Sequence, residues 1–154
     1  VIREAQQAGL HITIHAGEWG GAENVGEAIH HLQAERIGHG VRVLEDPAVV
    51  ELARDREVAF CVCMTSNLQS GIVARLEEHP VRAMLLAGLN VTLNTDDPGI
   101  SQIRLSDEYQ KFCEGLGFAP ETLRERVLAA ARSAFLPEAE RQALVDRLSA
   151  EFVI

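Results

Sequence analysis

Short apolar runs rich in β-branched residues alternate with longer stretches that carry apolar positions at helical spacing. Such alternation is typical of βα units and of a parallel sheet. The pattern predicts strands at 10–15, 36–39, 58–62 and 89–94, and it becomes wholly helical after about residue 104. The fold class that it predicts is α/β, with four parallel strands and a helical C-terminal part.

Glycine and proline mark the expected helix boundaries. Gly9 ends a helix over 1–8, because a glycine just after a helix readily adopts a positive φ. Asp46 followed by Pro47 is typical of an N-cap and the first helical position, for a helix to about Arg54. The other helices are expected at 22–34, from 79–80 to 88, and near 105–114, 121–134 and 138–150, with a loop at 64–67.

Polar residues occupy one face of the first predicted strand, where His11, Thr13 and His15 alternate with apolar residues. Thr92, Asn94 and Asp96 continue the same pattern in and after the fourth strand. A parallel sheet that is covered by helices on both faces would be apolar throughout, so a polar face indicates the lining of a barrel or cleft. We expect His11, deeper along its strand than His15, to point into that interior.

The same polar groups collect where the strands end, which is where α/β proteins bind ligands. His15 and Glu18 follow the first strand and His39 ends the second. Ser66 and Asn67 follow the third strand, and Asp96 and Asp97 follow the fourth. Neutral imidazole and ionised carboxylate suit Zn²⁺, which activates a bound water. Each group alone also has a structural explanation, such as a buried histidine or an Asx turn. Polar groups at all four strand ends favour a functional site.

Composition narrows the function further. The chain of 154 residues has 14 basic and 23 acidic side chains, a net charge of −9, with no basic block that would bind nucleic acid. Its apolar runs are too short to cross a membrane. The odd count of 3 cysteines, without framework spacing, indicates a cytoplasmic protein. We expect residues 1–154 to form one partial barrel domain.

Four ordered motifs carry a family resemblance: His15-Ala16-Gly17-Glu18, 36–40 (Arg-Ile-Gly-His-Gly), 65–67 (Thr-Ser-Asn) and 93–98 (Leu-Asn-Thr-Asp-Asp-Pro). In this order they resemble the second half of the adenosine deaminase family of metal-dependent hydrolases. The resemblance implies the C-terminal half of a (β/α)₈ TIM barrel followed by C-terminal helices. It also implies one Zn²⁺ per complete site, and a purine nucleoside substrate that is hydrolysed to inosine and ammonia.

The resemblance assigns roles to individual residues. His15 and Asp96 resemble zinc ligands, and Glu18 resembles the proton donor to purine N1. His39 resembles the residue that orients the attacking water and assists its deprotonation. Asp97 is similar to the hydrogen-bonding partner of the purine ring, and Gly17 is the glycine that permits close approach of substrate.

Two departures from the family pattern matter. Met64 follows Cys63 where the family usually has proline, so that loop is expected to differ in rigidity. The larger departure is that the His-x-His pair, which supplies two further zinc ligands in the family, does not occur; we interpret the adjacent His30 and His31 as helix surface. A catalytic zinc uses about three protein ligands. The hypothesis is therefore that this chain alone binds zinc weakly and is inactive, and that its partner is a missing N-terminal half.

The substrate, and whether the chain is catalytic at all, stay open. Within the family, the substrate is adenosine, adenine or aminofutalosine. Outside catalysis, the chain is a truncated half-barrel that self-associates through open strand edges. The other zinc deaminase class, with His-x-Glu and Pro-Cys-x-x-Cys, is excluded because Cys61 and Cys63 have the wrong spacing and no His-x-Glu occurs.

Overall fold

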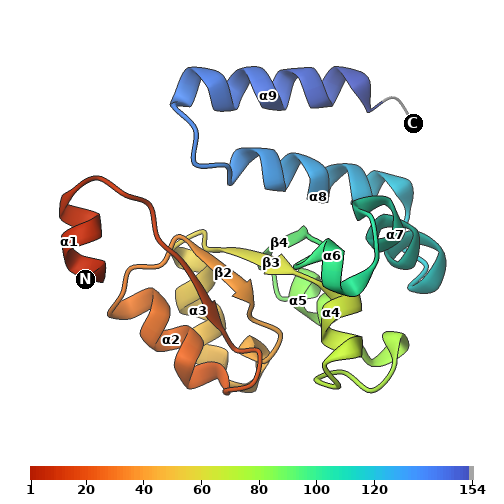
Figure 1. Ribbon diagram of the computed structural model, residues 1–154, viewed down its shortest axis with the longest axis horizontal. Coiled ribbons are helices and arrows are strands. Elements are labelled where there is room, and N and C mark those ends of the chain that lie inside the picture. The colour runs from red at the N-terminus through yellow and green to blue at the C-terminus, as the bar shows by residue number, and fades with distance from the viewer. Residues whose placement is uncertain (153–154) are drawn as a thin grey trace. The chain divides into compact units, whose positions relative to one another are not determined.

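The computed structural model describes residues 1–152 and divides into two compact units (Figure 1). The first unit comprises Val1–Val62 and Pro80–Val91. The second comprises Cys63–His79 and the residues from Thr92 onward. Among the described residues, no helix is long and apolar enough to span a membrane.

Four parallel strands alternate with helices, which confirms the predicted fold class. The strands are β1 (Thr13–Ala16), β2 (Arg36–His39), β3 (Ala59–Val62) and β4 (Asn90–Leu93), and their order in the sheet is the order in the sequence. Strand β1 pairs with β2, and β2 with β3, in parallel. Sequential order is expected for successive βα units, since each crossover returns the chain beside the strand it has left.

Helices of the first unit cover the apolar face of its strands (Figure 1). These helices are α2 (Ala22–His30), α3 (Pro47–Asp55) and α5 (Val81–Leu86), with a 3₁₀ turn at Val43–Glu45. Helix α1 (Ile2–Gln7) precedes β1 and buries none of its residues. Its fully buried side chains include Val25, Ile29, Ile37, Val43 and Phe60. The predicted boundaries hold at Gly9, where φ is +79°, and at Asp46, whose side chain accepts a hydrogen bond from the Ala48 amide.

The second unit is helical apart from the end of β4. It contains α4 (Met64–Gln69), a 3₁₀ turn at Leu76–Glu78, α6 (Pro98–Ser101), α7 (Leu105–Gln110), a π-helical segment (Lys111–Gly115), α8 (Pro120–Arg132) and α9 (Glu138–Glu151). The rings of Phe112 and Phe118 stack with centroids 4.0 Å apart. Helices α8 and α9 pack as a pair, and the Arg124 guanidinium donates to the Ser149 carbonyl at 3.3 Å.

Two predicted boundaries are wrong in the structure. The segment 64–67, predicted as a loop, is the first part of α4. Helix α2 ends at His30 rather than 34, because Gln33 has a φ of +50° and the Ala34 amide donates back to the Ala28 carbonyl. This left-handed residue with a long return bond is a common way of ending a helix.

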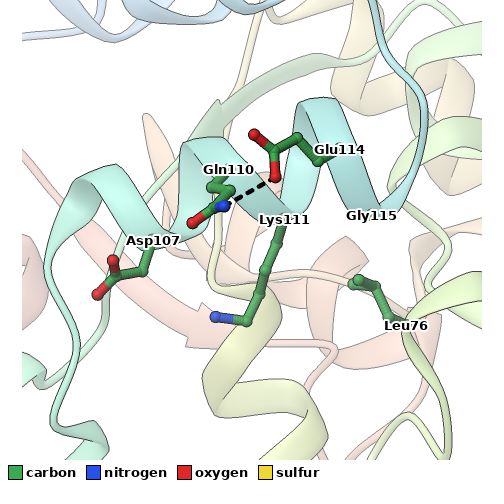
Figure 2. A pocket seen from close by; sticks show the side chains of 6 residues that line it. All are labelled: Leu76, Asp107, Gln110, Lys111, Glu114 and Gly115. Atoms are coloured by element: carbon green, nitrogen blue, oxygen red, sulfur yellow. Dashed lines mark hydrogen bonds between the residues drawn. The ribbon is translucent and has the colours of Figure 1, made fainter.

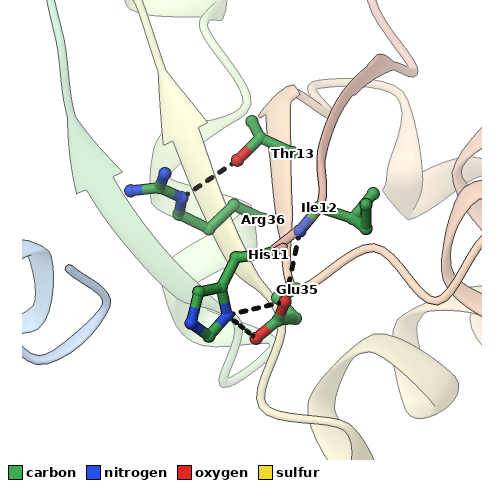
Figure 3. Close-up of polar contacts among 5 residues, drawn as sticks. All are labelled: His11, Ile12, Thr13, Glu35 and Arg36. Atoms are coloured by element: carbon green, nitrogen blue, oxygen red, sulfur yellow. Dashed lines mark hydrogen bonds and ion pairs between the residues drawn. The ribbon is translucent and has the colours of Figure 1, made fainter. Parts of the chain in front are cut away.

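The start of β1 also differs from the prediction, since the strand begins at Thr13 rather than at residue 10 (Figure 3). The Glu35 carboxylate accepts from the Ile12 amide at 3.2 Å and bonds the His11 ring at 2.8 Å. The Ile12 carbonyl also accepts from the Glu35 amide at 3.0 Å, so backbone and side chain of Glu35 both bond the chain just before Thr13. The His11 side chain is half exposed and pairs with Glu35, and it alternates with the buried Ile12. The expectation that His11 points into an interior stays a prediction.

Candidate active site

His15 lies on β1, level with Gly38 of the neighbouring strand. A Cβ on Gly38 would come to 3.0 Å from the His15 ring carbons, an unusually tight contact that the ring would have to relieve by shifting. Glycine at this position therefore leaves the room in which the imidazole lies. This is a positioning feature that the sequence did not single out, although the glycine precedes the predicted His39.

His39 ends β2 with a backbone that non-glycine residues seldom adopt. Its φ is +60°, in the left-handed region, and its side chain is buried. His39 is level with Ala16, and in a regular strand its side chain would face away from His15. Instead the strand ends, and the rings of His15 and His39 lie with centroids 5.3 Å apart. Backbone strain of this kind is concentrated at functional sites.

Glu18 reaches the same place from the loop after β1. Its Oε1 lies 3.5 Å from Nε2 of His39, and the carboxylate side chain is only 18% exposed. The first unit thus brings together three predicted site residues, His15, Glu18 and His39. An acid and an imidazole within this distance can exchange protons with one substrate.

The loop that carries Glu18 is fastened to the loop after β2. The Arg42 amide donates to the Gly17 carbonyl at 3.0 Å, and the Arg42 guanidinium donates to the Trp19 carbonyl at 2.7 Å. Glu45 accepts a further hydrogen bond from Arg42 and, with its charge, raises the pKa of that guanidinium. Trp19 itself is 67% exposed. Both neighbours of Glu18 are therefore held by their backbone carbonyls.

Gly17 has a φ of +64°, and a Cβ there would lie 2.5 Å from Val25 Cγ2 and 3.2 Å from the Cα of Gly40. Close packing of the two loops thus accounts for glycine at this position. Its predicted part in substrate binding stays a prediction.

Asp96 lies in the second unit, three residues beyond β4, and also has a left-handed backbone, with φ of +62°. The Ser66 hydroxyl donates to its Oδ2 at 2.7 Å. Metal-binding carboxylates are commonly oriented by such a hydrogen bond. The carboxylate is exposed, and the geometry is compatible with a ligand role.

Asp97 caps the short helix α6, because its Oδ1 accepts from the amides of Gly99 and Ile100, both at 3.0 Å. Asp97 therefore has the capping role that an Asp-Asp-Pro sequence suggests. The two capping bonds occupy Oδ1, so they fix the orientation in which Asp97 would meet a substrate.

Each residue of the Thr65-Ser66-Asn67 motif has its own side-chain partner in the second unit. Thr65 bonds Glu108, Ser66 bonds Asp96, and Asn67 Oδ1 lies 3.2 Å from Nε2 of His79. Glu108 and His79 are buried, and burial lowers the pKa of His79 to about 4.

Sequence reasoning missed Glu108 and His79. They lie 12 to 44 residues from their partners, so no local spacing marks them.

A separate hollow in the second unit is lined by Leu76, Asp107, Gln110, Lys111, Glu114 and Gly115 (Figure 2). Gln110 donates to Glu114 across its wall at 2.7 Å. None of the predicted site residues lines it, and it belongs to the surface of α7 and the π-helical segment.

The family model for adenosine deaminase matches residues 2–151. The chain belongs to the adenosine deaminase family. This confirms the resemblance drawn from the four motifs, which are spread between residues 15 and 98.

Curated members of the adenosine deaminase family resemble the chain over nearly all of its length. An adenosine deaminase of Klebsiella pneumoniae (strain 342) is 40% identical over 148 residues, which is 96% of this chain and 44% of the relative. The adenosine deaminase of Escherichia coli O139:H28 (strain E24377A / ETEC) is 38% identical over 150 residues, covering 97% and 45% respectively. The chain thus spans about half the length of these relatives, and it corresponds to their C-terminal half.

Solved structures of the deaminase family share the fold. An adenine deaminase from Arthrobacter aurescens superposes with a TM-score of 0.92 at 34% identity, over 97% of this chain and 46% of that one. An amidohydrolase from Burkholderia ambifaria, solved with bound Zn, gives a TM-score of 0.90 at 26% identity, over 98% and 43%. These neighbours are TIM-barrel proteins, so the chain has the fold of about half such a barrel.

Proposed function

We propose that this chain supplies the C-terminal half of the active site of a zinc-dependent purine nucleoside deaminase. The observation that carries the proposal is the convergence of His15, Glu18 and His39 in a chain that matches the adenosine deaminase family. The reaction is hydrolytic: water adds at C6 of adenosine, and inosine and ammonia are released. A cytoplasmic location, as expected from the cysteine content, is part of the proposal.

The residues present fit a zinc ion. His15 offers an imidazole beside a glycine that clears space for it, and Asp96 offers a carboxylate oriented by Ser66. Histidine nitrogen and carboxylate oxygen are ordinary zinc ligands. When bound, zinc would activate water as the nucleophile. We propose His15 and Asp96 as two of its ligands, with the remaining ones contributed by sequence outside these 154 residues.

The chain's other site residues move protons and hold the base. Glu18 would donate a proton to purine N1, which makes C6 more electrophilic. His39, 3.5 Å from Glu18, would orient the water and take up its proton. Asp97, with Oδ1 fixed by the start of α6, would hydrogen-bond the purine ring, and Gly17 would let it approach. All of these steps use groups at the strand ends.

Adenosine is the first substrate to test, because curated relatives at 38–40% identity are adenosine deaminases. Adenine is the second, because a structural neighbour with a TM-score of 0.92 is an adenine deaminase. Aminofutalosine remains the third substrate, and a non-catalytic half-barrel that self-associates remains the alternative outside catalysis.

The deciding experiment uses the protein expressed from its own gene. Zinc content is measured by elemental analysis, and ammonia release is measured with adenosine, adenine and aminofutalosine. We expect one zinc per site and the highest kcat/KM for adenosine. Treatment with a chelator should abolish turnover, and added Zn²⁺ should restore it. A zinc-loaded protein that deaminates none of these purines would favour the non-catalytic alternative.

A further inference from the structure

A buried carboxylate, Glu108, bonds the residues next to Ser66, whose hydroxyl contacts the proposed zinc ligand Asp96. The proposed reaction gives Glu108 no role. Glu108 of α7 is completely buried, which is rare for an ionisable side chain unless it is fully hydrogen-bonded. Its Oε2 accepts from the Met64 amide at 2.8 Å, and its Oε1 accepts from the Thr65 amide at 3.1 Å. The Thr65 hydroxyl also donates to Oε1.

These three donors all belong to the first turn of α4. The amides at the start of a helix have no partner inside the helix, so a side chain that binds them fixes where the helix begins. Ordinarily the residue just before the helix provides this cap, but Cys63 makes no side-chain cap bond here. Glu108 takes over the function from 44 residues away.

A second buried side chain, His79, contacts Asn67 at the other end of the Thr65-Ser66-Asn67 motif. The Nε2 of His79 lies 3.2 Å from Oδ1 of Asn67, and because a carbonyl oxygen only accepts, Nε2 carries the hydrogen. Burial, which lowers the pKa of His79 to about 4, keeps the ring neutral at pH 7. The residue between the two fixed ones is Ser66, and its hydroxyl donates to Asp96 at 2.7 Å.

We propose that Glu108 is a positioning residue for metal binding: by fixing the first turn of α4 it aims the Ser66 hydroxyl at Asp96 and so sets the orientation of that carboxylate. This inference rests on the proposed function, in which Asp96 is a zinc ligand. Contacts behind a metal ligand typically change metal affinity about 10- to 100-fold when they are removed.

The test measures the zinc dissociation constant by chelator competition, in the protein expressed from its own gene. Glu108→Gln replaces one acceptor oxygen by an amide group that cannot accept from the α4 amides. Glu114→Gln makes the same chemical change on an exposed residue of the adjoining π-helical segment. We expect Glu108→Gln and Ser66→Ala each to weaken zinc binding about tenfold, and Glu114→Gln to leave it unchanged.

A double variant separates positioning from general loss of stability. If Glu108 acts through Ser66, adding Glu108→Gln to Ser66→Ala should weaken zinc binding by less than twofold, about the limit of measurement, although the thermal midpoint still falls. The visible spectrum of the Co²⁺-loaded protein should change alike in both single variants. Independent, multiplying losses of zinc affinity would overturn the proposal, as would unchanged affinity in Glu108→Gln.

Failure to fold and failure to bind zinc have separate consequences. If Glu108→Gln does not fold, Thr65→Val, which removes one donor to Glu108 and keeps the branched shape, replaces it; unchanged zinc affinity in that variant counts against the proposal. If the unsubstituted protein binds no zinc, the proposed function fails and the inference falls with it. If it binds zinc and only the variants behave otherwise than expected, the proposed function stands and the inference alone is wrong.

Discussion

Two residues at the predicted site share a backbone conformation that is costly for a side chain with a Cβ. His39 and Asp96 have φ values of +60° and +62°. In His39 the left-handed backbone accompanies a ring that lies near His15 and Glu18 instead of following the alternation of the strand. Such conformations cost about 1–3 kcal/mol each and persist where the surroundings enforce them. At both positions, therefore, the local fold holds a proposed site residue in a conformation that its backbone disfavours.

Glu18 gives the most direct test at the scale of one residue. Glu18→Gln removes the proposed proton donor but keeps the size of the side chain. We expect kcat with adenosine to fall by about 100- to 10,000-fold, the usual worth of a positioned acid, with zinc content unchanged. Steady-state kinetics and elemental analysis check this. Glu27→Gln, on the exposed face of α2, is the matched control, and equal activity in the two variants would remove Glu18 from the mechanism.

Gly38 gives a second test that concerns only the room beside His15. In Gly38→Ala the added Cβ would lie 3.0 Å from the ring, so the imidazole must move. Overpacking of this kind costs about 1–3 kcal/mol of unfolding free energy. We expect zinc affinity to fall as well, because the proposed ligand His15 is displaced. Urea denaturation and chelator competition measure the two effects, and a variant with normal zinc affinity would show that His15 does not depend on this glycine.

The sequence singles out candidate site residues more readily than the residues that hold them in place. His15, Glu18, His39 and Asp96 follow predicted strands in a recognisable order, so they could be singled out. Glu108 could not, because it stands among mixed charges that are typical of a helix surface, and its partners at 64–65 are far away in the sequence. Buried polar contacts between distant segments have no local signature.

At the scale of elements, a similar limit explains the errors in the predicted boundaries. The sequence predicts a loop at 64–67, because this segment carries no helical pattern and Cys63 is a poor N-cap for α4. The capping group arrives from α7, which no local rule includes. Conversely, α3 was predicted well because Asp46 and Pro47 carry its start signal in the sequence itself.

The anchoring of α4 by His79 predicts how stability depends on pH. The pKa of His79 is about 4 in the folded protein against an ordinary value of 6.5, so the unfolded chain binds the proton more readily. The contribution of neutral His79 to the free energy of unfolding is fully present above pH 6.5. It is lost as pH falls towards 4, and the total loss is up to about 3 kcal/mol. Urea denaturation of metal-free protein between pH 7.5 and pH 4, taken as test conditions at about the two limits of this titration, measures it.

The comparison that isolates this group is His79→Gln, which keeps a hydrogen-bond donor but does not titrate. Its free energy of unfolding should decline less between the two pH limits than that of the unsubstituted protein. His30→Gln, at an exposed position of α2, is the matched control and should retain the full decline. If His79→Gln declines as steeply as the control, titration of His79 does not govern acid stability.

At the scale of the whole molecule, the strand order explains why we propose deaminase activity for a complete barrel rather than for these strands alone. Strands β1 and β4 are at the two ends of the order, so among the described residues each has a neighbouring strand on one side only. A closed barrel has no edges, and a (β/α)₈ barrel needs about 250 residues. The relatives of this chain are about twice as long, and the chain matches 44–45% of them.

The last prediction concerns the 154 residues produced alone. They offer two proposed zinc ligands, His15 and Asp96, whereas a catalytic zinc uses about three protein ligands. We expect weak zinc binding, no ammonia release from adenosine, and self-association through the open strand edges, measured by chelator competition, a coupled ammonia assay and light scattering. The same chain with Glu18→Gln, prepared in parallel, reveals any turnover from contaminating enzyme. Turnover that needs Glu18 in a monomer of 16.8 kDa would mean that these residues complete the site by themselves.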